Sequence, residues 1–231
     1  TWAYVSGGAG DEATLRANTQ AWQDIGLRPR VLRRLAGGHT RTTLLGRPLA
    51  HPLLAAPMAG LGAVHVQGER GLALACAALG MGLVLSSPSG TTLEDVARLA
   101  LGDTDRGPLW LQMYWPGDRG LALEAVQRAE AAGVEALVLT VDAPVSGIRD
   151  RELRSGWTAQ AGAGPAVAPR PLSPGQSRLF DDLLQHAPTW DEVAWLRSQT
   201  RLPLLLKGIT HPEDARLAQG LGVAGLIASN H

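Results

Sequence analysis

The chain has 231 residues, a net charge of zero and a sequence pI near 7.0, and 45% of its residues are hydrophobic. This length and apolar content fit one α/β domain of barrel size. The neutral balance gives no support for nucleic acid or an anionic membrane surface as a partner, and no apolar run reaches the roughly 18 residues that cross a bilayer. The one cysteine, Cys76, excludes an intrachain disulfide framework, is expected in the core and favours a reducing, cytoplasmic setting.

The first 52 residues are expected to form a cover segment ahead of a barrel. A helix is predicted over residues 12–23, and the Gly-rich stretch over residues 4–10 is expected to be a loop that folds over a pocket mouth. The barrel itself would begin after this segment.

Near-continuous apolar runs then alternate with helix-like segments. Such runs imply strands buried on both faces, as in a parallel sheet covered by helices. The runs cover residues 53–57, 82–86, 109–114, 136–142, 202–207 and 225–231, and the helices between them are predicted at 69–78, 92–101, 120–132, 190–199 and 212–220. The repeat of strand, loop and helix predicts an α/β fold, a TIM (β/α)8 barrel.

Two parts of this barrel are unusual. Residues 155–177 are rich in Gly, Ala and Pro and are expected to form a mobile lid loop. Six predicted strands do not close an eight-stranded barrel, so strands seven and eight are expected to be missing from a single domain over residues 1–231 that is truncated at its C-terminus.

Polar groups end most of the apolar runs, at the edge where a βα-barrel keeps its chemistry. Together with the Gly-rich start, these motifs resemble the FMN-dependent L-2-hydroxy acid oxidases and dehydrogenases, the lactate oxidases most of all and the glycolate and hydroxymandelate oxidases next. The motifs are SGGAGDE (6–12), APMA (56–59), LQMY (111–114), TVD (140–142), SGIRDR (146–151), LKGI (206–209) and SNH (229–231).

Oxidation of a 2-hydroxy acid needs a base, a two-electron acceptor and a clamp for the carboxylate. His231 is the candidate base because imidazole titrates near neutral pH, and Asp142 would orient it and stabilise its charge. A guanidinium fork can hold a carboxylate, and the resemblance selects Arg149 for this role. It also places the hydroxyls of Tyr4 and Tyr114 on the substrate, with Tyr114 among the catalytic residues. The alternatives are a solvated His231, an Asp142 that caps a turn and a surface Arg149.

The resemblance implies FMN as the cofactor. Lys207 is the one lysine among 21 basic residues and closes a buried run, so it is expected near the flavin, where it would stabilise negative charge. The other expected FMN contacts are the backbone of Pro57, Met58 and Ala59 and the side chains of Ser86, Gln112, Thr140 and Ser229.

The predicted reaction is oxidation of a small L-2-hydroxy acid, lactate in the first place, with oxygen reduced to hydrogen peroxide. The family's second carboxylate arginine and its phosphate-binding segment would follow His231, so the chain as given is expected to hold only the isoalloxazine half of the site. The resemblance implies a homotetramer, and the histidine spacing suggests no metal. Alternatives are an oxidase of aromatic hydroxy acids such as mandelate, a lactate monooxygenase, and a flavin-free fragment that acts as a binding module.

Overall fold

The structure is a computed structural model that describes residues 1–102, 104–145, 147–157 and 170–230. The chain forms two compact units, Thr1–Thr40 with Ser146–Ala159, and Arg41–Val145 with Gln160–His231, which are called the small and the large unit below. Within the described ranges, no helix has the length and apolar character needed to cross a membrane.

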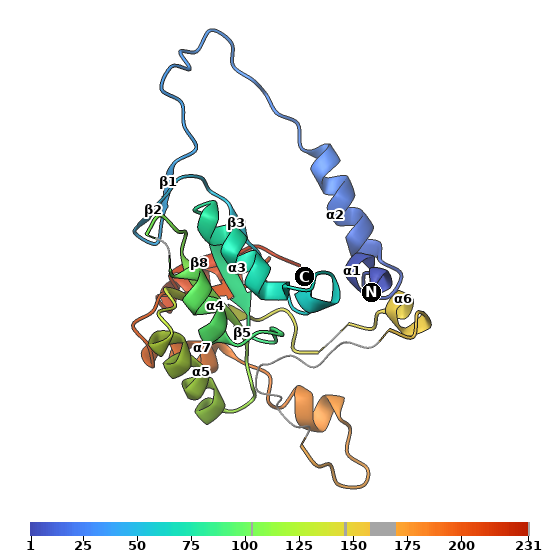
Figure 1. Ribbon diagram of the computed structural model, residues 1–231. Coiled ribbons are helices and arrows are strands. Elements are labelled where there is room, and N and C mark those ends of the chain that lie inside the picture. The colour runs from blue at the N-terminus through green and yellow to red at the C-terminus, as the bar shows by residue number, and fades with distance from the viewer. Residues whose placement is uncertain (103, 146, 158–169, 231) are drawn as a thin grey trace. The chain divides into compact units, whose positions relative to one another are not determined.

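The large unit contains a curled parallel sheet whose strand order follows the chain (Figure 1). In the described part of the chain its strands are β3 (Leu54–Ala55), β4 (Gly82–Ser86), β5 (Leu109–Tyr114), β6 (Ala136–Thr140), β7 (Leu204–Lys207) and β8 (Gly225–Ile227). Each strand pairs in parallel with the next one along the chain. The predicted runs and the predicted barrel-type fold are therefore confirmed.

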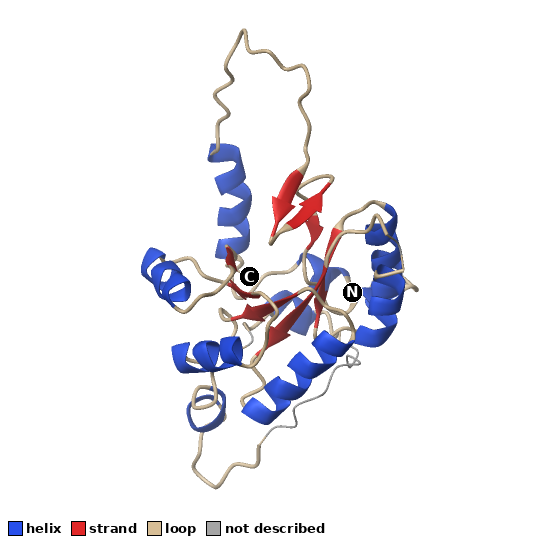
Figure 2. Cartoon of the chain, turned by 90° about the vertical axis from the view of Figure 1, so that its left-hand side faces the viewer, coloured by secondary structure: helices blue, strands red, loops and turns tan. Residues whose placement is uncertain are grey.

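Helices connect successive strands and cover the outer face of the sheet (Figure 2). They are α3 (Gly68–Ala78), α4 (Leu93–Ala100), α5 (Arg119–Ala131), α7 (Trp190–Ser198) and α8 (Pro212–Gly220), with the 3₁₀ turn η1 (Leu61–Ala63) and the π turn η2 (Leu179–Leu183) in the loops. Their starts follow the sequence signals, because Thr92 and Asp118 accept hydrogen bonds from the backbone N–H groups of Asp95 and Leu121. Cys76 of α3 lies in this core as predicted, and burial raises the pKa of its thiol.

Successive side chains along each strand point to opposite faces of the sheet, so the buried residues form two separate clusters. Leu83 and Leu85 of β4 belong to the cluster that packs against the helices, whereas Val84 belongs to a second cluster on the opposite face. The members of this second, inner cluster are Val84, Trp110, Ala136, Val138 and Leu205, with Leu44, Leu54 and Ile227 packed against them. The same alternation puts the strand-end residues Ser86, Gln112, Thr140 and Lys207 on the inner face.

The hairpin of β1 (Thr42–Leu44) and β2 (Arg47–Leu49) was not predicted. Its strands pair antiparallel, Gly46 at its turn has a φ of +81°, and Leu44 packs against the inner cluster. The strands are too short to show the apolar alternation that identifies a strand in a sequence.

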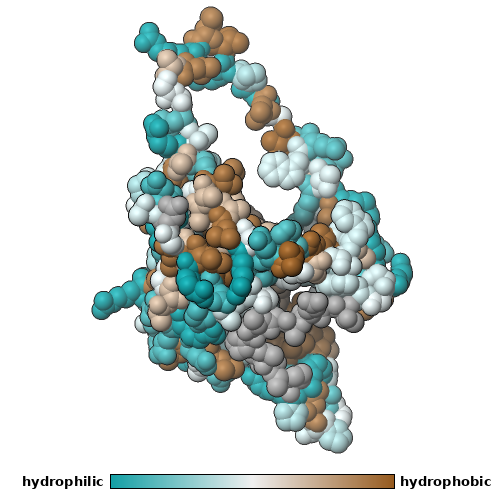
Figure 3. Space-filling view, viewed as in Figure 1, coloured by the Kyte–Doolittle hydropathy of each residue, from teal (hydrophilic) through white to brown (hydrophobic). Residues whose placement is uncertain are grey.

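The small unit contains α1 (Trp2–Ser6), α2 (Ala13–Asp24) and α6 (Asp150–Arg154). The expectation of a loop over residues 4–10 is wrong for its first half, because α1 runs to Ser6, whose hydroxyl donates to the Trp2 carbonyl at 2.8 Å. Figure 3 shows apolar side chains exposed along the segment that follows α2, at the top of the view. Among them are Leu27, Val31, Leu32 and Leu35.

The predicted lid loop is only partly described. Positions 155–157 and 170–177 contain neither helix nor strand, in agreement with the absence of a packing pattern there, and residues 158–169 lie outside the described ranges.

Candidate active site

A buried row of hydrogen-bonded polar side chains crosses the inner face of the sheet at the ends of three adjacent strands. The Ser86 hydroxyl of β4 donates to Gln112 Oε1 of β5 at 2.8 Å, and Gln112 Nε2 donates to Thr140 Oγ1 of β6 at 2.8 Å. All three residues are buried, and each lies two positions after a member of the apolar inner cluster on the same face of its strand. We call these residues, which the sequence predicted as FMN contacts, the polar row.

The polar row predicts a clear stability difference between two glutamine variants. Gln112→Leu removes both hydrogen bonds and leaves buried hydroxyls without their amide partner, so we expect the free energy of unfolding to fall by about 1–3 kcal/mol. Gln20→Leu is the matched control, because Gln20 bonds Asp24 on the exposed face of α2 and should change stability by less than about 0.5 kcal/mol. Urea unfolding measures both, and equal losses in the two variants would contradict a structural role for the row.

The end of β7 brings three further residues together. Lys207 is half-buried, whereas the leucines before it in β7 are buried, and its carbonyl accepts from the Val141 N–H at 2.9 Å. Asp142, the residue after Val141, is half-buried beside the same end of β7. The adjacent Gly208 N–H donates to the Ile227 carbonyl of β8 at 3.1 Å. The two predicted residues Lys207 and Asp142 therefore lie at neighbouring strand ends, next to the segment that leads from β8.

Gly208 belongs to the LKGI motif, but no role of its own was predicted for it. Its φ is +109°, a conformation that favours glycine, and a Cβ built on it would lie 2.7 Å from Oδ1 and 2.5 Å from Cβ of Asp142, and closer still to Cγ. The Asp142 carboxylate is thus packed directly on the backbone of residue 208. A glycine directly after a buried apolar strand, where another chain segment can approach the backbone closely, was the available signal.

A cavity of about 510 Å³ lies beside the polar row in the large unit. Its walls include Tyr114 and Thr140 at paired positions of β5 and β6, and Tyr114 is 38% exposed. We call it the strand-end cavity. The predicted substrate residue Tyr114 therefore faces space large enough for a ligand.

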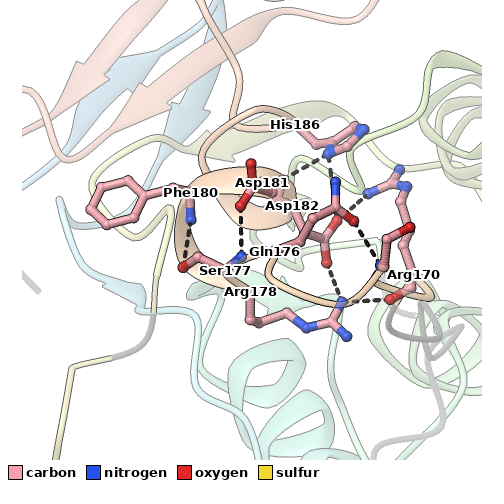
Figure 4. A network of polar contacts seen from close by, with 9 residues as sticks. Arg170, Gln176, Ser177, Arg178, Phe180, Asp181, Asp182 and His186 are labelled. Carbon is pink, nitrogen blue, oxygen red and sulfur yellow. Dashed lines mark hydrogen bonds and ion pairs between the residues drawn. The ribbon is translucent and has the colours of Figure 1, made fainter.

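The wall of the strand-end cavity also contains two arginines that pair with one buried carboxylate (Figure 4). Arg178 Nη1 lies 2.5 Å from Asp182 Oδ2, and Arg170 Nη1 lies 3.3 Å from Asp182 Oδ1. The hydrogen bonds from Arg178 and then Arg170 hold the pKa of the Asp182 carboxyl below its usual range. His186 Nδ1 lies 2.7 Å from the Asp182 carbonyl oxygen, which only accepts, so Nδ1 carries a proton. These four residues, unpredicted as a group, are called the arginine cluster.

The small unit brings together the other predicted substrate residues. The Arg149 guanidinium lies 5.1 Å from the centre of the Tyr4 ring, and Trp157 stacks on the same ring at 4.2 Å. The neighbouring Arg151 pairs with Glu12 at 2.5 Å, so its charge is balanced within the small unit. Arg149 also lies 3.6 Å from Glu152 and is half-buried.

The remaining predicted contacts lie just beyond strands of the large unit. Pro57, Met58 and Ala59 follow β3, and Met58 is 44% exposed. Ser229 follows β8 and is half-buried. His231 lies outside the described residues.

The donor set fits the polar edge of a flavin. In the polar row, Gln112 Nε2 has a second N–H and the Thr140 hydroxyl has its own hydrogen, so both can donate to ring carbonyl oxygen or nitrogen. Lys207 would add a positive charge on the same inner face. The backbone of residues 57–59, which follow β3, could contact the flavin ring. FMN would therefore contact these residues.

Comparisons with known proteins agree with this chemistry. The family model described as FMN-dependent dehydrogenase matches residues 1–231. An L-lactate oxidase of Alicycliphilus denitrificans is 43% identical, with 99% of this chain and 63% of that protein covered, and a 4-hydroxymandelate oxidase of Amycolatopsis orientalis is 37% identical, with 99% and 64% covered. A mandelate oxidase variant solved with (S)-mandelic acid has a TM-score of 0.85 and 34% identity over 100% of this chain and 63% of its own. The chain thus spans less than two thirds of the length of these relatives.

Proposed function

The chain belongs to the family of FMN-dependent dehydrogenases, and from this premise we propose that it forms the flavin and substrate site of an enzyme that oxidises a small L-2-hydroxy acid, with lactate as the first substrate to test. The observation that carries the proposal is the polar row, which lies on the same inner sheet face as Lys207 and beside Tyr114. Such a row of donors at strand ends matches the place where βα-barrels bind ligands.

In the proposed chemistry, His231 is the base that removes a proton from the substrate. The imidazole accepts a proton from the substrate, and the Asp142 carboxylate, packed on Gly208, orients the ring and stabilises its positive charge. Arg149 holds the substrate carboxylate through its two parallel N–H groups, and the Tyr4 ring beside it limits the directions in which that guanidinium can point. The Tyr4 and Tyr114 hydroxyls donate to the substrate.

FMN, when bound, supplies the acceptor for the two electrons that leave the substrate carbon. The proposed role of Lys207 is to place a positive charge where negative charge develops, and that of Pro57, Met58, Ala59, Ser86, Gln112, Thr140 and Ser229 is to hold the ring. The substrate loses two electrons and two protons and becomes the 2-oxo acid, and oxygen takes them up to form hydrogen peroxide.

Lys207→Met tests the charge assigned to the end of β7. The thioether keeps much of the length and apolar stem but loses the charge, so we expect flavin reduction by lactate to slow by about 10²-fold with little change in substrate affinity. Stopped-flow absorbance under anaerobic conditions measures both quantities. Unchanged reduction kinetics would mean that Lys207 is only structural.

Turnover in air tests the overall reaction. With L-lactate we expect one hydrogen peroxide and one 2-oxo acid per oxygen consumed, measured with an oxygen electrode and a peroxidase-coupled assay. Acetate and carbon dioxide in place of peroxide would identify a monooxygenase, and turnover of mandelate but not lactate would identify an aromatic hydroxy acid oxidase. A homotetramer and a cytoplasmic setting are part of the proposal, and light scattering measures the former.

A further inference from the structure

The strand-end cavity is larger than a lactate-sized substrate requires. Its volume of about 510 Å³ is in the range that accommodates ligands of many atoms, whereas the substituent of lactate is one methyl group. Tyr114, Thr140 and the arginine cluster all line this one cavity, so a substrate bound at Tyr114, beside the flavin, would extend its substituent into the space that Arg170 and Arg178 line.

The arginine cluster has an excess of positive charge. Its two guanidiniums face one carboxylate, that of Asp182, whose side chain is 7% exposed and whose pKa is lowered by both of them. One positive charge therefore remains uncompensated within the cluster even with a neutral His186. In a cavity with apolar walls such a charge attracts anions.

The two guanidiniums of the arginine cluster are fixed by hydrogen bonds and still have N–H groups that these bonds do not use. Arg170 Nη2 donates to the Gly117 carbonyl at 2.9 Å, in the loop that follows Tyr114, and Arg178 Nη1 donates to the Arg170 carbonyl at 2.7 Å. Each guanidinium has five N–H groups, and the contacts to described residues involve only the terminal nitrogens Nη1 and Nη2 of Arg170 and only Nη1 of Arg178. A fixed guanidinium with remaining N–H groups is suited to a carboxylate.

We propose that the strand-end cavity takes the substituent of the 2-hydroxy acid and that Arg170 and Arg178, in its wall, recognise a second carboxylate. The preferred substrates are then 2-hydroxy dicarboxylic acids. This inference rests on the proposed function, because it places the reacting carbon at Tyr114, beside a flavin held by the polar row.

The test compares acids of equal chain length with and without the second carboxylate. Calorimetry with the flavin-loaded protein should show 2-oxoglutarate, the product analogue with two carboxylates, binding about tenfold more tightly than 2-oxopentanoate at low salt, and the preference should shrink as salt is added. The kcat/KM for (S)-2-hydroxyglutarate should exceed that for (S)-2-hydroxypentanoate by a similar factor.

Charge variants separate recognition from support of the loop. Arg178→Gln should abolish the preference for 2-oxoglutarate, while 2-oxopentanoate binds as before. If Arg170→Gln does not fold, Arg170→Lys replaces it; this variant keeps the positive charge and should retain much of the preference. Arg128→Gln is the control, because Arg128 pairs with Glu94 on the exposed surface and should leave the preference intact.

Equal affinities for the two oxo acids, equal losses for both in Arg178→Gln, or a preference for mandelate over the dicarboxylic acids would overturn the inference. Failure of the proposed function gives a different result, since then neither lactate nor any of these acids reduces the flavin.

Discussion

His231→Ala is expected to keep FMN and lose its reduction by substrate. Removal of a general base slows proton transfer by about 10²–10⁴-fold, whereas the expected flavin contacts lie on other residues. Anaerobic mixing with L-lactate, followed by visible absorbance, measures the reduction rate, and the absorbance of the purified variant measures its flavin content. The sequence makes this prediction, since His231 lies outside the described residues.

A histidine elsewhere in the chain controls for the loss of an imidazole. His39 is exposed in the small unit and has no assigned role, so His39→Ala should be reduced at the rate of the unchanged protein. Rapid reduction in His231→Ala would remove that residue from the role of base.

Gly208→Ala is expected to slow reduction by about 10²-fold, because a new methyl group would push the Asp142 carboxylate from its place. The added Cβ overlaps Asp142 atoms, so either the carboxylate or the β7 end must move. The reduction rate should fall more than the affinity for the substrate. The pH profile of reduction should also shift, because the proposed role of Asp142 is to stabilise the charged imidazole of His231.

Gly222→Ala separates this effect from backbone strain. Gly222 has a φ of +73° and no atom of another residue within 4 Å of where a Cβ would lie, so the variant carries strain of about 1 kcal/mol without a clash. It should unfold at lower urea concentration and still be reduced at the normal rate. In an Asp142→Ala background, Gly208→Ala should slow reduction little further, and additive losses would contradict the proposed link.

The sequence predicted the sheet well because its signal is local. Each of the longer strands, such as Leu109–Tyr114 and Ala136–Thr140, is a near-continuous apolar run, and helix starts carry capping residues such as Thr92. The hairpin at Thr42–Leu44 was missed because three residues are too few for a periodic pattern. The helix at Trp2–Ser6 was hidden by the glycines that follow it.

For the candidate site, the sequence named residues at strand ends but gave no contacts between them. The spacing of Ser86, Gln112 and Thr140 pointed to one strand edge, but only the register of β4, β5 and β6 shows that they bond to one another. The arginine cluster depends on a loop without periodicity, and the role of Gly208 depends on a side chain more than sixty residues away. Contacts of this kind follow from tertiary structure and leave no local pattern.

The visible absorption spectrum of the purified, FMN-loaded protein before and after anaerobic addition of L-lactate tests the central claim most directly. We expect a protein-bound flavin spectrum that bleaches on addition of L-lactate and returns when air is admitted. A bound flavin that L-lactate, mandelate and 2-hydroxyglutarate all leave unreduced would contradict the proposed oxidation of 2-hydroxy acids.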